Sequence, residues 1–148
     1  MKPQGRKKSY CPFCDAKLSF FNAEFTRLIG VLESDFFKVE GMFYLPTALG
    51  KYGAIFPEGM TIKEGAKVNF LCPECRKDLT TSFNDNLAFM KVLDERQAEF
   101  IVLINKIYGK HATYVFDYQG KSLRQKYGPD AEEIADSEFE KDLNFFGA

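Results

Sequence analysis

Four cysteines, arranged as two Cys-Pro-x-Cys motifs, constrain this chain more than any other feature of its sequence. The first motif lies in "YCPFCDAKL" and contains Cys11 and Cys14, and the second lies in "LCPECRKDL" and contains Cys72 and Cys75. The sequence contains no other cysteine, and residues 15–71 separate the two motifs. In a reducing compartment, paired Cys-x-x-Cys motifs are more typical of metal ligands than of disulfides. We therefore expect the two motifs to meet in space.

Each motif places two thiolates on the same side of a tight backbone bend, and the proline after the first cysteine stiffens that bend by fixing φ. Two such bends complete the tetrahedron that Zn²⁺ prefers in closed structural sites. The sequence therefore predicts one structural zinc ion, with the ligands Cys11, Cys14, Cys72 and Cys75. Because four thiolates outweigh the charge of the ion, nearby cations would stabilise the site. The cations that flank the two motifs are Lys7, Lys8, Lys17, Arg76 and Lys77.

The motifs resemble those of the zinc ribbons, whose ligands lie in two Cys-Pro-x-Cys knuckles at the tips of adjacent hairpins. The resemblance covers "YCPFCDAKL" and "NFLCPECRKDL" only. Zinc ribbons usually keep their knuckles much closer in sequence, so residues 15–71 imply a β-rich insertion between the two ligand pairs. Apart from the two knuckles, the sequence shows no internal repeat.

Two alternatives to zinc remain open. A rubredoxin-like iron site also uses paired Cys-x-x-Cys motifs, and a tetrahedron of thiolates suits iron as well as zinc. Rubredoxins typically have glycine after the second cysteine of a pair, whereas Asp15 and Arg76 stand there in this chain. This difference favours zinc over iron. The other alternative is a set of buried or redox-active cysteines without a metal.

The rest of the chain indicates a mainly β fold. The hydrophobic fraction of 45% excludes a disordered protein, and the 16 Phe and 7 Tyr residues favour strands. Glycines and prolines interrupt short apolar runs throughout residues 35–65, which is typical of short strands and turns. Residues 66–71 read as a strand that leads into the second knuckle. Residues 18–32 fit either a helix or a pair of strands, because their apolar positions recur at roughly helical spacing but include Gly30.

Three strand-like runs follow the second knuckle, at residues 87–93, 99–108 and 112–118. Short turns join them, so we expect an antiparallel meander. Residues 100–104 are apolar at every position. This pattern predicts that both faces of the middle strand are covered.

The sequence divides into three regions. Residues 1–9 form a basic arm that we expect to be flexible, and residues 10–128 form the zinc-binding β-rich domain. Residues 129–148 predict an acidic, amphipathic C-terminal helix, because Asp130 and Glu133 have the spacing of a capping box. The apolar face of this predicted helix consists of Ala131, Ala135, Phe139, Leu143 and Phe146.

The sequence gives little indication of catalysis, so we expect a non-enzymatic protein. A site closed by four cysteines leaves no coordination position for a reactive water. His111 is the only histidine, and no G-x-S-x-G motif or P-loop accompanies it. We interpret His111 as a solvated residue at a hairpin bend.

The most direct functional interpretation is a zinc-dependent binding or regulatory module with a protein partner. One alternative is a nucleic-acid-associated protein of transcription or translation that uses Arg6, Lys7, Lys8, Arg76 and Lys77. The net charge of −1 provides no global attraction to nucleic acid, so such binding would need this local patch. A second alternative is a rubredoxin-like or thiol-based redox protein.

The sequence also bears on location. No signal peptide is evident, and no apolar stretch is long enough to span a membrane. We expect a cytoplasmic protein with no membrane partner, and the sequence leaves its partner and its oligomeric state open.

Overall fold

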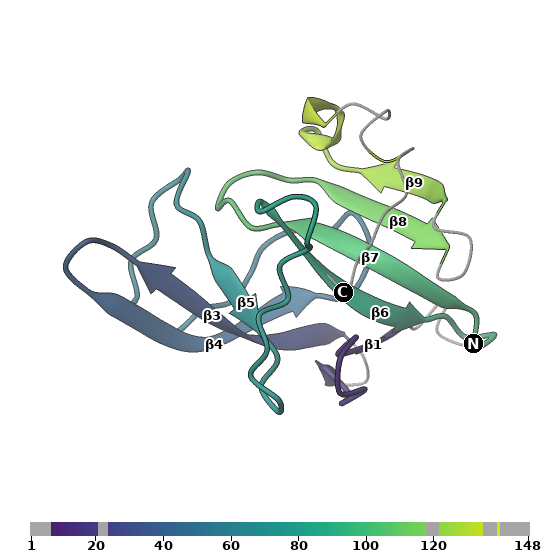
Figure 1. The fold of residues 1–148 in the computed structure, drawn as a ribbon, viewed down its shortest axis with the longest axis horizontal. Helices are drawn as coiled ribbons and strands as arrows, with labels where there is room; N and C mark the ends of the chain where they lie inside the picture. Colours follow the sequence, from purple (N-terminus) through teal and green to yellow (C-terminus); the bar gives the residue numbers. More distant parts are fainter. Residues whose placement is uncertain (1–6, 21–23, 118–121, 135–138, 140–148) are drawn as a thin grey trace.

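The computed structural model describes residues 7–20, 24–117, 122–134 and 139, which form a mainly β structure, as predicted (Figure 1). In order, the strands are β1 (Lys8–Tyr10), β2 (Ser19–Phe20), β3 (Phe25–Glu33), β4 (Lys38–Pro46), β5 (Asn69–Leu71), β6 (Leu87–Leu93), β7 (Glu99–Asn105), β8 (Thr113–Asp117) and β9 (Leu123–Tyr127). A 3₁₀ turn, η1 (Ala131–Glu133), follows β9. Within these residues, no helix has the length and apolar character needed to cross a bilayer.

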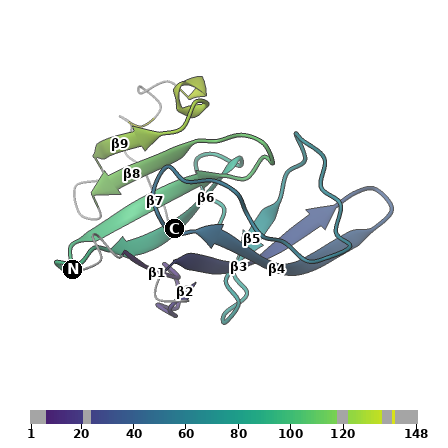
Figure 2. The same cartoon turned by 180° about the vertical axis from the view of Figure 1, so that it is seen from behind.

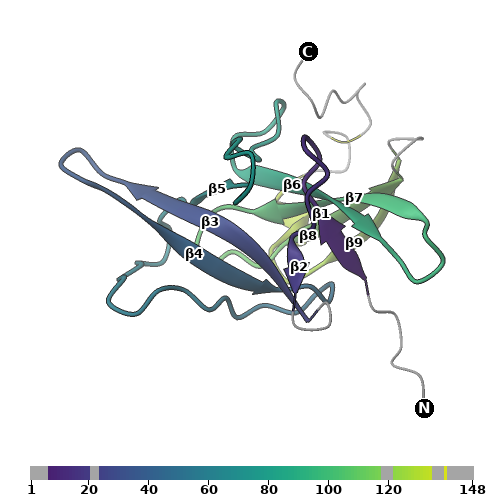
Figure 3. The same ribbon diagram turned by 90° about the horizontal axis from the view of Figure 1, so that it is seen from below.

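The strands form two antiparallel sheets (Figures 1 and 2). The first sheet has the order β1-β6-β7-β8-β9. In the second sheet, β3 is central: β4 pairs with one of its edges over the full length, and β2 and β5 share the other edge. The β3–β4 hairpin extends well beyond the rest of the molecule (Figure 3).

The central position of β3 settles the ambiguity of residues 18–32 in favour of strands. Leu28 and Gly30 lie on one face of β3, Ile29 and Val31 lie on the other, and all four are buried. A strand that is covered on both faces carries consecutive apolar residues, so its sequence loses the strict alternation that distinguishes it from a helix.

The predicted meander is confirmed by the pairing of β6 with β7 and of β7 with β8. Both faces of β7 are covered, as the apolar run indicated. Val102 packs into the core between the two sheets, whereas Ile101 and Leu103 pack into a second core on the opposite face. Ala131 and Phe139 from the C-terminal segment complete that second core.

The predicted C-terminal helix is absent from the part of this segment that the structure describes. Residues 131–133 form a single 3₁₀ turn, and Ile134 is already extended. Asp130 does not form the predicted capping box, because its carboxylate accepts a hydrogen bond of 2.8 Å from the backbone N–H of His111. Residues 135–138 and 140–148 of the predicted helix lie outside the described residues.

The start of the chain also differs from the predicted arm. Lys8 and Ser9 belong to β1, and Ser9 is completely buried. They are part of the first sheet because β1 pairs with β6. Residues 1–6 of the predicted arm lie outside the described residues.

Candidate metal centre

Both cysteine motifs fold into the same backbone turn. In the first, the N–H of Cys11 donates to the carbonyl of Ala16 at 2.9 Å, and the N–H of Asp15 donates to the carbonyl of Cys11 at 3.0 Å. Asp15 has a φ of 64°. This left-handed residue reverses the chain directly after the second cysteine of the motif.

The second motif repeats this pattern. The N–H of Cys72 donates to the carbonyl of Lys77 at 3.1 Å, and the N–H of Arg76 donates to the carbonyl of Cys72 at 2.9 Å. Arg76 has a φ of 61°. Each turn therefore brings two sulfurs to one side of the backbone, as the sequence predicted.

The two turns bring all four sulfurs together. The Sγ atoms of Cys11, Cys14, Cys72 and Cys75 all lie within 4.8 Å of one another. Cys11 and Cys75 have their sulfurs 3.8 Å apart, and Cys14 and Cys72 have theirs 3.7 Å apart. A tetrahedral zinc ion with Zn–S bonds of about 2.3 Å requires sulfurs about 3.8 Å apart. The cluster therefore fits a single four-coordinate ion, and its separations are far longer than a disulfide bond of about 2.0 Å.

Backbone amides are directed at the sulfurs. The N–H groups of Phe13 and Cys14 donate to the sulfur of Cys11 at 3.3 and 3.4 Å, and the N–H of Glu74 donates to the sulfur of Cys72 at 3.3 Å. Such donors stabilise thiolates, because they place partial positive charge next to the sulfur.

The four cysteines differ in their burial. Cys11 and Cys72 are completely buried, Cys75 is half-buried and Cys14 is exposed. Burial raises the pKa of the Cys11 thiol to about 12, and it also raises the pKa of Cys72. Burial acts in the same direction on Cys75, but hydrogen bonds from the backbone of Lys77 and from the neighbouring cysteines outweigh it and lower the pKa. Burial therefore opposes ionisation of these two thiols, and a bound cation would favour it.

Two of the flanking cations predicted to stabilise the site have partners of their own. Arg76 forms an ion pair of 3.0 Å with Glu40 of β4. The ammonium group of Lys77 lies 4.9 Å from the centre of the Phe13 ring. An additional pair that the sequence did not indicate joins Lys91 of β6 to Asp15 in the first knuckle.

The similarity of the two knuckles extends to the strands around them. The first knuckle follows β1 and precedes β2, β3 and β4, and the second follows β5 and precedes β6 and β7. Each leading strand pairs with the hairpin of the other half: Tyr10 of β1 pairs with Lys91 of β6, and Leu71 of β5 pairs with Ile29 of β3. The sequence indicated this repeat only at the cysteines.

This exchange of strands gives β1 to β4 and β5 to β7 a similar order and pairing around the cysteine cluster, whereas β8 and β9 extend only the first sheet. In this correspondence, Cys11 matches Cys72 and Cys14 matches Cys75. The two sulfur pairs related in this way have nearly equal separations, 3.8 and 3.7 Å. The candidate metal position therefore lies between the two knuckles, where one ion would contact both.

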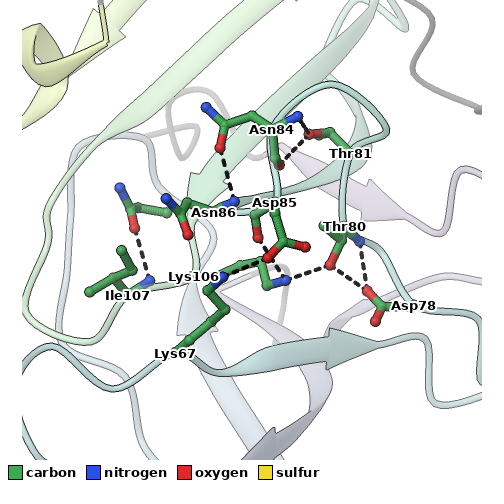
Figure 4. Close-up of polar contacts among 10 residues, drawn as sticks. Lys67, Asp78, Thr80, Thr81, Asn84, Asp85, Asn86, Lys106 and Ile107 are labelled. Atoms are coloured by element: carbon green, nitrogen blue, oxygen red, sulfur yellow. Dashed lines mark hydrogen bonds and ion pairs between the residues drawn. The ribbon is translucent and has the colours of Figure 1, made fainter.

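A buried lysine supports the second knuckle (Figure 4). Lys106 is 2% exposed, and its ammonium group donates to the hydroxyl of Thr80 at 2.6 Å and to the carbonyl of Asp85 at 3.0 Å. Thr80 in turn donates to the carboxylate of Asp78, which directly follows the knuckle. Burial lowers the pKa of Lys106, although Asp78 and Asp85 partly counter this effect. The sequence did not indicate that Lys106 is buried, because a lysine at the end of a strand is normally solvated.

His111 does not belong to the cysteine cluster. It is exposed, and its ring stacks on that of Tyr52 with 4.5 Å between the ring centres.

Comparisons of the chain with protein-family models, with curated proteins and with solved structures found no match. The interpretation of the site therefore depends on its geometry and chemistry.

Proposed function

We propose that this protein is a non-enzymatic interaction module whose four-cysteine site binds a structural zinc ion. The observation that carries the proposal is the set of four sulfurs within 4.8 Å of one another, contributed equally by two equivalent turns. Four protein ligands fill the tetrahedral coordination of zinc, so the ion would contribute stability rather than a reactive water.

The projecting β3–β4 hairpin is the feature that favours a protein as the binding partner. At its tip, the side chains of Phe36 and Phe37 are 95% and 60% exposed. The hydroxyl of Ser34 accepts hydrogen bonds of 3.3 Å from the N–H groups of both residues, which fixes the backbone of the tip. Two adjacent exposed aromatic rings on an ordered, projecting turn are suited to insertion into an apolar pocket of a partner.

Nucleic-acid binding has weaker support. Of the proposed basic patch, Arg76 is paired with Glu40, and Lys77 lies over the ring of Phe13. The exposed carboxylates of Glu74 and Asp78 stand next to these cations in the second knuckle. Alternating charges of this kind give a weaker attraction for phosphates than an uninterrupted basic surface.

Elemental analysis of the purified protein tests the metal assignment. We expect one zinc ion per chain and a colourless protein, because Zn²⁺ has a filled d shell. Iron in the site, with visible absorption from the thiolates, would contradict the proposal in favour of the rubredoxin-like alternative. Protein purified under reducing conditions that contains no metal and takes up no added zinc would also contradict it.

Affinity capture from native cell extract tests the role of the hairpin. We expect the wild-type protein to retain a specific partner, and the double variant Phe36→Ser/Phe37→Ser to lose it while keeping its zinc and its thermal stability. Ile55→Ser is the matched control, because Ile55 is another large apolar residue that is 53% exposed. Equal capture by the double variant would show that the hairpin tip is not the contact surface.

A further inference from the structure

A cavity of about 350 Å³ lies between the two sheets, away from the cysteines. Its apolar walls come from both sheets, with Met90, Val92 and Val102 on one side and Phe43, Leu45 and Phe70 on the other. Most of segment 47–54 and all of segment 105–113 also line it, together with Ser9, Thr26, Pro46, Glu64, Val68 and Ile104. The apolar walls of the cavity therefore lie in the inter-sheet core, and the cavity opens to the surface at the exposed residues Lys51, Glu64 and His111.

The size of this cavity distinguishes it from a packing defect. Protein interiors are normally filled, and they contain few voids larger than a water molecule. An engineered apolar cavity of about 150 Å³ already binds benzene. The volume found here falls within the range of about 300–1,000 Å³ that is typical of pockets for small molecules.

One end of the cavity carries a chain of three hydroxyl groups. The hydroxyl of Ser9 lies 2.7 Å from that of Thr26, which lies 3.2 Å from that of Thr47. Ser9 and Thr26 are 0% and 2% exposed. Three hydroxyls have three protons, and the two bonds between them use two. The remaining proton lies on a hydroxyl at one end of the chain, and at the half-buried end, Thr47, it is available to an acceptor on a bound molecule.

Besides the hydroxyls, the lining contains one acidic and four basic residues: Glu64, Lys51, Lys106, Lys110 and His111. Lys106 contributes to the lining, but its ammonium group donates to Thr80 and to the carbonyl of Asp85. Lys110 is paired with Glu133, and within the described residues the three hydroxyls bond to one another and not to a charged side chain. Burying a carboxylate against hydroxyl groups alone is costly, whereas a ketone or alcohol oxygen needs only the one available hydrogen bond.

We infer that the cavity is a binding site for an uncharged, mainly apolar small molecule with a single oxygen acceptor, which the hydroxyls of Ser9, Thr26 and Thr47 recognise. The ligand enters the space between the sheets, and its apolar part contacts the side chains of both. This inference is independent of the metal centre, because the two sites share no residue.

Titration of the zinc-loaded full-length protein tests the inference, with methyl heptyl ketone, octanoate and octane as probes. We expect saturable binding of the ketone, measured by calorimetry, with amide shifts in nuclear magnetic resonance spectra confined to the cavity lining. Octanoate and octane should bind more weakly than the ketone, because one is charged and the other lacks the acceptor. No binding of the ketone to folded protein, or tighter binding of octanoate, would overturn the inference.

Two variants separate the cavity from other apolar surfaces. Ala54 lies in the lining, so Ala54→Phe should fill part of the space and weaken ketone binding by at least about tenfold. Val39→Phe is the matched control, because it adds the same ring on the exposed hairpin and should leave binding unchanged. Equal affinity in both variants, or shifts centred on Phe36 and Phe37, would contradict the proposed location.

A third variant tests the hydroxyl chain without changing the volume of the cavity. Thr47→Val replaces a half-buried hydroxyl with a methyl group. We expect it to weaken ketone binding by about fivefold, the value of one hydrogen bond, and to leave octane binding unchanged. An equal loss for both probes would show that the hydroxyls do not recognise the ligand, and this variant remains informative if Ala54→Phe does not fold.

Discussion

At the residue scale, Cys72 and Cys14 have different structural surroundings although both contribute to the same cluster. Cys72 is completely buried, whereas Cys14 is exposed. We expect Cys72→Ser to lower the unfolding free energy by about 3 kcal/mol or more, because the binding energy of a structural metal is folding energy. Urea denaturation with and without a chelator measures this loss.

Cys14→Ser is the matched comparison. It also removes one ligand, but a serine or water oxygen can occupy the exposed position with little cost in burial. We expect Cys14→Ser to retain more stability than Cys72→Ser and to lose its metal to a competing chelator faster than the wild-type protein. A Cys72→Ser protein as stable as the wild type would show that the cluster does not support the fold.

Lys106 is the other single residue whose role follows from its contacts. Replacing it with methionine keeps the volume of the side chain but removes the donor to Thr80 and to the carbonyl of Asp85. We expect Lys106→Met to lower the unfolding free energy by about 1–3 kcal/mol, because both acceptors lose a charged partner. Lys38→Met, at a side chain that is 65% exposed, should change it by less than about 0.5 kcal/mol. Equal stability of the two variants would contradict a supporting role for Lys106.

At the scale of elements, β3 depends on a glycine. Gly30 is buried, and a methyl group there would overlap with the ring of Phe43, which lies diagonally across the β3–β4 pair. We expect Gly30→Ala to lower the unfolding free energy by about 1–3 kcal/mol, because a buried ring can move only by disturbing the core. Thermal and urea denaturation of the variant measure this cost.

A double-mutant cycle identifies the cause of that cost. If Phe43 is first shortened by Phe43→Leu, most of the overlap disappears, and Gly30→Ala should be tolerated better in this background. We expect the two changes to be coupled by about 1 kcal/mol. Strictly additive effects would mean that the backbone of β3, rather than the ring, requires glycine.

The C-terminal segment is attached to β8 through Tyr114. Its hydroxyl, on a fully buried side chain, donates to the carbonyl of Ala131 at 2.8 Å. We expect Tyr114→Phe to lower the unfolding free energy at neutral pH by about 1–2 kcal/mol, because this buried carbonyl loses its donor. Chemical denaturation checks the effect, and an unchanged free energy would contradict it.

The burial of Tyr114 also makes the free energy of unfolding depend on pH. Burial raises the pKa of Tyr114 from 10.0 to about 12, so the folded protein retains this proton where the unfolded chain has lost it. The stability that this group contributes is complete below pH 10 and is lost as the pH rises towards 12, by up to about 2–3 kcal/mol. Tyr114→Phe should lose less stability across this range than the wild type, and identical slopes for the two proteins would contradict the assignment.

The elements also show how far the sequence could predict the structure. The meander was predictable because β6, β7 and β8 are joined by short turns with clear signals. The C-terminal helix was predicted wrongly at its start: the acidic residue expected to cap it, Asp130, accepts a hydrogen bond from the backbone of His111 in the loop before β8. Such a competing tertiary partner is not visible in local sequence patterns. The clustering of the four cysteines was predictable because the spacing of each Cys-x-x-Cys motif is what a shared metal would require.

At the scale of the whole molecule, the sequence showed two similar knuckles, and the structure shows a similar order and pairing of the strands around them, with β8 and β9 added to the second half. Outside the cysteine motifs, the halves share strand order and pairing rather than residue types. Burial on a sheet requires only an apolar side chain of suitable size, so the same arrangement accepts different residues in each half. A metal ligand has no such freedom, which explains why the repeat is visible only at the cysteines.

This arrangement predicts how the fold responds to loss of the metal. Each knuckle anchors the leading strand of one half against the hairpin of the other, through the pairing of β1 with β6 and of β5 with β3. We expect chelation to increase amide hydrogen exchange in β1 and β5 together and to a similar degree, because one ion holds both knuckles. The centre of the first sheet, where β7 is paired on both sides, should remain more protected.

Hydrogen-exchange mass spectrometry of the protein with and without a chelator distinguishes this coupling from independent loops. The variant Cys14→Ser changes only the first knuckle, yet the shared ion requires that exchange also rises in β5, which lies in the other half of the sequence. Exchange that increases in β1 alone would mean that the knuckles are held separately by their own turns. In that case the similar arrangement of the two halves would not depend on a common metal ion.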